Sequence, residues 1–224
     1  MTKLQSLLES LPASKVIDVP KFIKIDLSES NQRLATFDIT NAKKFENYIE
    51  SYLQENIADA AFGGYIESRS LYRRSTIFNE VQADERNIHI GLDLWIKAGT
   101  AVLAALDGVV HSFNNNVGLG NYGPTIILKH AVGEQIFYTL YGHLSLKSLE
   151  SIKIGDSFSK GEKLGDLGDA SINGDYAPHL HFQIIKNIVD YKGDYPGVCS
   201  KNDLSFYLEN CPDPNLLLKI NTAK

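Results

Sequence analysis

Residues 87–96 read Asn-Ile-His-Ile-Gly-Leu-Asp-Leu-Trp-Ile, so that aliphatic residues alternate with His89, Gly91, Asp93 and Trp95. A period of two is typical of a β-strand, in which successive side chains point to opposite faces. The segment is therefore predicted to be a strand with His89 and Asp93 on the face opposite to its aliphatic side chains.

His89 and Asp93 are candidates for binding one metal ion. An imidazole and a carboxylate that face the same space suit Zn²⁺, which accepts nitrogen and oxygen ligands at about 2.0–2.2 Å. Four residues of a straight strand span roughly 13 Å between Cα atoms, which is about the limit for two side chains to reach one ion. Binding by both residues therefore requires a bend, and we expect it at Gly91, which has no Cβ.

Two further segments carry histidines in strand-like patterns. Residues 177–184 read Ala-Pro-His-Leu-His-Phe-Gln-Ile, which places His179 and His181 on one side of a second predicted strand. Residues 137–144 read Phe-Tyr-Thr-Leu-Tyr-Gly-His-Leu, with His143 near the end of the run.

All six histidines lie between positions 89 and 181. A single histidine such as His111 or His130 is most often a hydrogen-bonded structural residue or a surface residue, and we assign both of them that role. Four histidines and an aspartate on the polar faces of predicted strands indicate instead a common site.

The pattern along the whole chain predicts a mainly β protein with an N-terminal helical extension. A first helix is expected to follow Thr2 and to end at Pro12, and a second is expected across residues 41–60, with Gly63-Gly64 as its stop. From about residue 85 onward, short β-branched and aromatic runs separated by Gly, Asn and Asp predict an antiparallel sheet or sandwich. The predicted strands are 87–96, 100–113, 124–130, 135–144, 151–159, 163–168 and 179–186.

The domain organisation that follows has three parts. Residues 1–80 form an extension with amphipathic helices, residues 81–190 form the β domain, and residues 191–224 form a tail packed on that domain, with a short helix at residues 216–218. A chain of 224 residues that is 43% hydrophobic is long enough to bury one sizeable core.

Composition limits the partners and the compartment. The net charge of −5, without a run of Lys or Arg, argues against nucleic acid. No apolar run is long enough to span a bilayer, and the N-terminal leucine cluster is interrupted by Glu9, so we expect a cytoplasmic protein without membrane contact. Cys199 and Cys211 are expected to be reduced thiols, although their spacing leaves pairing open. Nothing in the sequence indicates the oligomeric state.

The three histidine segments together resemble the lysostaphin and LytM-type zinc endopeptidases, also called the β-lytic family. The pattern of that family is His-x-x-x-Asp, then Tyr-x-His-Leu, then His-x-His, and it is matched in the same order within residues 86–186. The resemblance implies one zinc ion per chain held by His89, Asp93 and His181. It also implies that His143 and His179 are the catalytic pair, and it leaves open which of them is the general base.

The resemblance implies hydrolysis of amide bonds in peptides or muropeptides, with glycyl or D-amino-acid residues as in peptidoglycan. Two departures bear on the substrate: Asn173 to Pro178 replace a small Gly-Ser/Thr-Gly segment, and Gln183 stands where relatives usually have Glu. The alternatives are a non-catalytic binding or activator module and a hydrolase of another small amide. The segment from Tyr72 to the tail is also similar to a peptidase-like domain of long cytosolic chains with phosphotransferase-like and class III aminotransferase domains.

Overall fold

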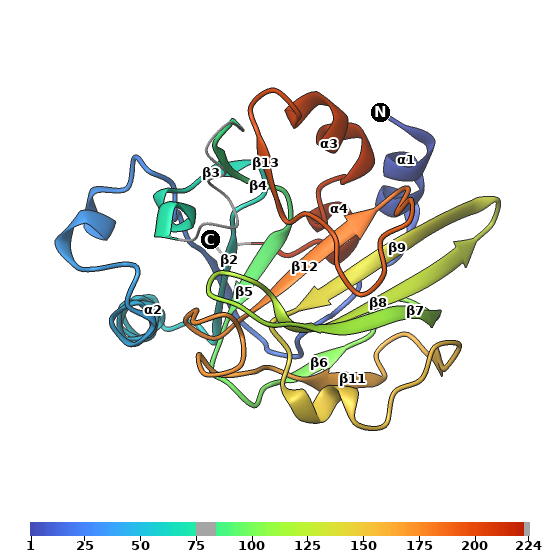
Figure 1. The fold of residues 1–224 in the computed structure, drawn as a ribbon. Helices are drawn as coiled ribbons and strands as arrows, with labels where there is room; N and C mark the ends of the chain where they lie inside the picture. Colours follow the sequence, from blue (N-terminus) through green and yellow to red (C-terminus); the bar gives the residue numbers. More distant parts are fainter. Residues whose placement is uncertain (75–83, 222–224) are drawn as a thin grey trace.

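The computed structural model describes residues 1–74 and 84–221, whose strands form three sheets (Figure 1). All strand pairs are antiparallel except β1 with β2. The protein is therefore mainly β, as predicted. The largest sheet has eight strands in the order β1 (Phe22–Lys24), β2 (Ala60–Gly63), β5 (Leu92–Trp95), β12 (His179–Ile185), β9 (Gln135–Gly142), β8 (Gly123–Val132), β7 (Gly108–Asn116) and β10 (Ser157–Phe158).

Two smaller sheets flank the large one. One pairs β11 (Lys163–Asp166) with β6 (Ala101–Leu103), and the other has the order β13 (Val198–Ser200), β4 (Arg86–His89) and β3 (Glu67–Ser68). The predicted strand 87–96 is thus divided between two sheets, because β4 ends at His89 and β5 begins at Leu92. The interruption includes Gly91, and this confirms the expected bend.

Gly91 is required at that position by the approach of another side chain. A Cβ placed on it would lie 2.4 Å from His181 Cε1 and 2.6 Å from His181 Nε2. Any larger residue would therefore displace the His181 ring, so the same glycine that permits the bend also admits the imidazole.

The two N-terminal helices form largely as predicted. Helix α1 (Lys3–Ser10) begins with a capping box between Thr2 and Gln5. It contacts α4 (Asn215–Leu218), the short helix predicted in the tail.

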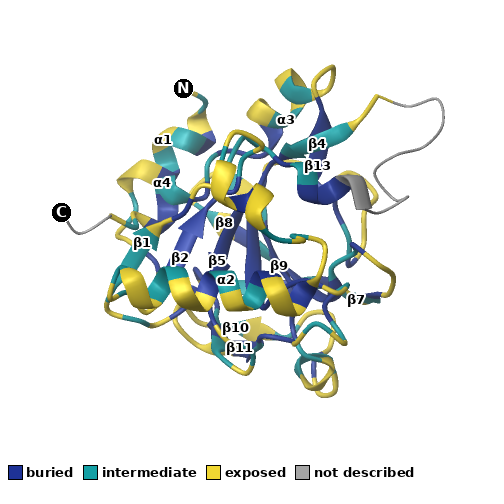
Figure 2. Ribbon diagram, turned by 90° about the vertical axis from the view of Figure 1, so that its left-hand side faces the viewer, coloured by how far each residue is buried: buried dark blue, intermediate teal, exposed yellow. Residues whose placement is uncertain are grey.

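Helix α2 (Ala42–Glu55) lies over the large sheet with one face exposed (Figure 2). On its buried face, the Phe45 ring packs 5.1 Å from that of Trp95. The helix ends earlier than predicted, because Ile57 has a φ of 49° and Ala60–Gly63 pair as strand β2 with β5. Burial of these four residues in the sheet overrides the helical pattern that extends to residue 60.

Several shorter elements also differ from the prediction. The expected strand 100–113 is divided into β6 and β7, and only Ser157–Phe158 of the expected strand 151–159 are extended within a sheet. Helix α3 (Leu204–Asn210) was not predicted. Within residues 1–74 and 84–221, the remaining helical turns are the 3-10 segments Gln32–Thr36, Ser70–Arg74 and Leu146–Leu149.

The N-terminal region contributes β1 and β2 to the same sheet as the strands of the predicted β domain. The predicted boundary between residues 80 and 81 lies outside the described residues.

Among residues 1–74 and 84–221, no helix is both long and apolar enough to cross a membrane.

Candidate metal centre

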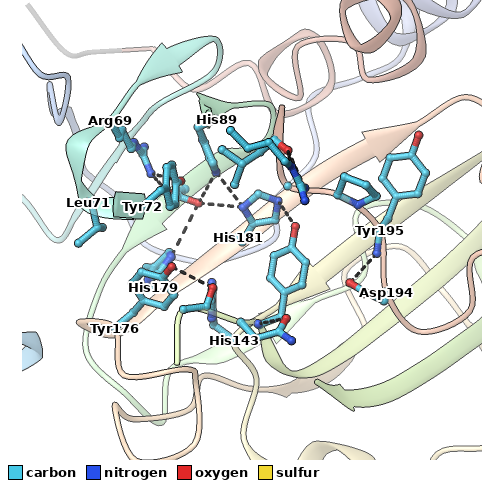
Figure 3. Close-up of a pocket in the computed structure, with 18 of the residues that line it drawn as sticks. Arg69, Leu71, Tyr72, His89, His143, Tyr176, His179, His181, Asp194 and Tyr195 are labelled. Carbon is cyan, nitrogen blue, oxygen red and sulfur yellow. Dashed lines mark hydrogen bonds and ion pairs between the residues drawn. The ribbon is translucent and has the colours of Figure 1, made fainter. Parts of the chain in front are cut away.

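Strand pairing brings His181, Asp93 and His143 together, and the end of strand β4 adds His89. His181 on β12 is paired with Asp93 on β5 at one side and with Gly142 on β9 at the other. His143 directly follows Gly142, and His89 is the last residue of β4 in the neighbouring sheet. The side chains surround a cavity of about 220 Å³ (Figure 3).

Three candidate ligand atoms converge at the floor of this cavity. His89 Nε2 lies 2.9 Å from His181 Nδ1, and Asp93 Oδ1 lies 3.2 Å from each of these nitrogens. All three residues are at most 3% exposed. These are the metal-ligand candidates identified from the sequence, and they are the group within the described residues whose donor atoms are close enough to share one ion.

Hydrogen bonds on the far side of each ring fix which nitrogen faces the cavity. His89 Nδ1 lies 2.9 Å from Gly64 O and donates to it, because a carbonyl oxygen only accepts. His181 Nε2 lies 2.9 Å from Gln183 Oε1. The Gln183 amide is itself oriented, since its Nε2 donates to Pro196 O and Cys211 Sγ. In their neutral forms, both imidazoles therefore direct lone pairs at each other and at the Asp93 carboxylate.

This donor set fits a divalent cation. Three atoms with lone pairs and no proton between them repel one another unless a positive charge lies among them. Two nitrogen ligands and one oxygen ligand suit a zinc-type site, in which ligand atoms at about 2.0–2.2 Å in tetrahedral geometry are about 3.3–3.6 Å apart. Three protein ligands also leave a fourth position free for water or substrate, as in catalytic zinc sites.

His143 and His179 lie beside the three ligands, with ring centroids 4.3 Å apart. His143 Nδ1 donates to Asn173 O at 2.9 Å and His179 Nδ1 donates to Ala177 O at 2.8 Å. Each ring therefore has an unprotonated Nε2. Burial lowers the pKa of His179 to about 4 and holds the pKa of His143 well below its usual range, so both rings are neutral near pH 7.

Trp95 orients His179 by stacking on one face of its imidazole ring. The two rings stack with centroids 3.9 Å apart and planes 19° from parallel. Trp95 was placed on the polar face of its strand by the sequence pattern, but its role as a support for His179 was not foreseen. Stacking of this kind restricts rotation of the imidazole and keeps its Nε2 edge directed at the site.

Arg69 was not predicted from the sequence. This arginine is 2% exposed, and its Nη1 donates to Asp93 Oδ2 at 2.5 Å while its Nε donates to Glu67 Oε2 at 2.6 Å. It belongs to no motif and lies 24 residues before Asp93. Burial alone would raise the pKa of Asp93, but the pKa lies well below its usual range because His89, Arg69 and two further histidines of the site surround the carboxylate.

The two remaining histidines have other surroundings, in agreement with their predicted roles. His130 is buried between Asp107 O, 2.8 Å from its Nδ1, and Thr139 Oγ1, 2.7 Å from its Nε2. His111 lies next to Ser112, with its Nδ1 2.9 Å from the hydroxyl. Neither of them lines the cavity. Cys199 and Cys211 are both buried free thiols.

Comparison with protein families finds that residues 87–192 match peptidase family M23. An uncharacterized metalloprotease of Haemophilus influenzae is 35% identical over 95 residues, which cover 42% of this chain and 18% of the relative. The peptidoglycan DD-endopeptidase ShyC of Vibrio cholerae is 32% identical over 100 residues, covering 44% of this chain and 20% of ShyC. The glycyl-glycine endopeptidase ALE-1 of Staphylococcus capitis is 31% identical over 99 residues, covering 44% of this chain and 25% of ALE-1.

These matches cover only a part of each protein. The chain spans between 18 and 25% of the length of the three relatives. Among solved structures, the catalytic domain of lysostaphin from Staphylococcus simulans aligns with 54% of this chain and 80% of its own length, at 27% identity and a TM-score of 0.38. The segment that matches the family contains all five residues predicted for the site, whereas Gly64 and Arg69 precede it.

Proposed function

We propose that this chain, whose residues 87–192 match peptidase family M23, is a zinc-dependent peptidase. The observation that supports this most strongly is the convergence of His89 Nε2, Asp93 Oδ1 and His181 Nδ1 within 3.2 Å of one another. The rings already use their other nitrogens as donors, so the three atoms are available to one cation. Zinc is the ion that best suits two imidazoles and one carboxylate with an open fourth position.

A bound zinc ion would supply Lewis acidity, which polarises a scissile carbonyl and makes water more acidic. The protein itself supplies two neutral imidazoles, His143 and His179, with unprotonated Nε2 atoms beside the ligands. One of them would accept the proton of the attacking water and then pass that same proton to the leaving amine, and the other would stabilise the oxyanion after taking up a proton from solvent. Burial of both rings excludes competing water and strengthens these interactions.

For the substrate, we propose peptides with glycyl or D-amino-acid residues, related to peptidoglycan. This proposal relies on the names of the relatives, which are a DD-endopeptidase and a glycyl-glycine endopeptidase. Residues of the segments 69–72 and 191–198 form parts of the cavity wall. Because these segments would hinder access of a large substrate, we propose short peptides or another small amide in preference to a polymer. The similarity of the segment from Tyr72 to the tail with the peptidase-like domain of long multidomain chains is supported only by the sequence resemblance described above.

The test begins with metal analysis of the purified protein. We expect about one zinc ion per chain, and we expect the zinc-loaded protein, but not the chelator-treated protein, to cleave peptides that contain Gly-Gly or D-Ala bonds. The absence of stoichiometric metal after incubation with zinc would contradict the proposal. Stoichiometric zinc without turnover of any peptide or small amide would favour a binding or activator module instead.

A further inference from the structure

Each of the three candidate ligands has a partner on the side away from the cavity. Gln183 accepts from His181, Gly64 accepts from His89, and Arg69 donates to Asp93. Gln183 lies within the segment that matches the family, but Gly64 and Arg69 lie in the N-terminal region. Two of the three ligands are therefore held by residues outside the matched segment.

Arg69 is held in a fixed position by its own surroundings. Its backbone N donates to Asn87 O at 2.9 Å, which joins residue 69 to strand β4. Glu67 accepts from Arg69 Nε through Oε2 and from Leu27 N, at 3.0 Å, through Oε1. Nη1 also lies 3.2 Å from the hydroxyl of Tyr72. The guanidinium is thus anchored on two sides before it reaches Asp93.

Gly64 provides the space for this guanidinium. Its φ is 96°, and a Cβ at this position would lie 1.8 Å from Arg69 Nη2 and 3.0 Å from His89 Nδ1. A side chain at residue 64 is excluded by conformation and by contact. The glycine therefore packs against both of the groups that it helps to orient.

The net charge of this cluster favours a bound cation. Two carboxylates, Glu67 and Asp93, contact one guanidinium, that of Arg69, so the formal charge of these three side chains is −1 when the imidazoles are neutral. The ion pair occupies Asp93 Oδ2 and leaves Oδ1 directed at the two imidazole nitrogens. Only one carboxylate oxygen is then available as a ligand.

We propose that Arg69 is a positioning residue of the metal centre, which holds Asp93 by Oδ2 so that Oδ1 alone is presented to the ion. This inference rests on the metal site of the proposed function, but not on the identity of the substrate. Loss of a residue that orients a metal ligand typically lowers metal affinity by about 10–100-fold. Without Arg69, the carboxylate is free to rotate and to bind through both oxygens.

The experiment compares Arg69→Met and Arg69→Lys with Arg33→Met, a control at an arginine whose ion pair with Glu55 is exposed. Metal affinity is measured without substrate by competition with a chromophoric chelator, and the site geometry is measured by the visible absorption of the cobalt-loaded protein. We expect about 10–100-fold weaker binding for Arg69→Met, with a weaker cobalt absorption because the coordination number rises. We expect an intermediate loss for Arg69→Lys, since lysine keeps the charge without the planar fork. Arg33→Met should match the unsubstituted protein.

Circular dichroism of the metal-free variants separates a folding defect from a defect of the site. Unchanged affinity and an unchanged cobalt spectrum in a folded Arg69→Met variant would overturn the inference. If that variant does not fold, the same result in folded Arg69→Lys would overturn it. Because substrate is absent from these measurements, a protein that binds metal but cleaves no peptide would count against the proposed function and leave this inference intact.

Discussion

His89 Nε2 and His181 Nδ1 lie 2.9 Å apart, and each ring already uses its other nitrogen as a donor to an oxygen atom. Two neutral imidazoles at this distance direct lone pairs at the same point, and this arrangement is favourable only when a cation lies between them. The consequences for metal binding, catalysis and stability are open to direct measurement.

Removal of a ligand should abolish stoichiometric metal binding. We expect His89→Ala, Asp93→Ala and His181→Ala each to lose zinc, because two remaining protein donors do not form a zinc site of this type. Metal analysis after dialysis measures the effect. His111→Ala is the control, since this ring lies outside the cavity, and it should retain zinc. A ligand variant with unchanged affinity would refute the assignment of that residue.

Asp93→Ala should carry a second cost that the histidine variants do not share. It leaves the buried Arg69 guanidinium without one of its two carboxylate partners. Breaking a buried ion pair from one side typically costs about 3–5 kcal/mol. Urea unfolding of the metal-free proteins should therefore show a larger loss for Asp93→Ala than for His89→Ala, and equal losses would argue against a strong ion pair.

His143 and His179 should respond differently from the ligands. We expect His143→Ala and His179→Ala to keep zinc and to lose hydrolysis by at least roughly 10²-fold, the usual scale for a positioned acid–base group. Zinc content and peptide turnover are measured on the same samples. Loss of zinc in His179→Ala together with retention in His181→Ala would reverse the assignment within this pair.

Gln183 should matter through the hydrogen bond that it accepts. Gln183→Met removes the acceptor of His181 Nε2–H while it keeps the size of the side chain, and we expect metal affinity to fall by about 10–100-fold. Gln183→Glu keeps an accepting oxygen for His181 but loses the donor to Pro196 O, so it should restore only part of the affinity. If both variants bind metal as tightly as the unsubstituted protein, the hydrogen bond at 2.9 Å has no orienting role.

The buried neutral histidines predict a pH dependence of stability for the metal-free protein. Burial lowers the pKa values of His89, His130, His143 and His179. The unfolded chain therefore takes up protons near pH 6.5 while the folded chain does so only at lower pH, and acid favours unfolding. The free energy of unfolding should fall below about pH 6.5 by about 1.4 kcal/mol per pH unit for each such group.

Urea unfolding in the presence of a chelator at pH 7.5, 6.0 and 5.0 measures this dependence. The double variant His143→Gln/His179→Gln should show a shallower fall, because two of the titrating groups are gone. A free energy of unfolding that stays constant across this range would contradict the assignment of neutral buried rings.

The walls of the cavity predict a preference among substrates. Residues of the segments 69–72 and 191–198 form parts of these walls, and we expect them to hinder a cross-linked polymer more than a short peptide. We expect the zinc-loaded protein to cleave soluble muropeptides or peptides with Gly or D-Ala faster than it releases fragments from purified sacculi. Rapid solubilisation of sacculi without turnover of the small compounds would exclude this preference.

The sequence predicted which side chains share the site because their signals are local. Alternation over 87–96 and 177–184 placed His89, Asp93, His179 and His181 on polar faces, Gly91 marked the bend, and the family resemblance selected His181 as the third candidate ligand; the structure brings His89, Asp93 and His181 close enough to share one ion. The orienting residues had no such signal, because Arg69 contacts Asp93 only after β3 pairs with β4 in a separate sheet. The end of α2 was predicted too late, at residue 60, for a similar reason: the helical pattern extends to that residue locally, whereas Ala60–Gly63 form strand β2, which pairs with β5.

The interruption at Gly91 places His89 in the three-stranded sheet and Asp93 and His181 in the eight-stranded sheet. An ion bound to all three residues would therefore add a cross-link between two sheets that are joined by the backbone of residues 90–91 and 64–66 and by the ion pair of Arg69 with Asp93. Metal binding should then slow amide hydrogen exchange selectively along β3, β4 and β13. The far edge of the large sheet, at β7 and β10, should exchange at the same rate with and without the ion.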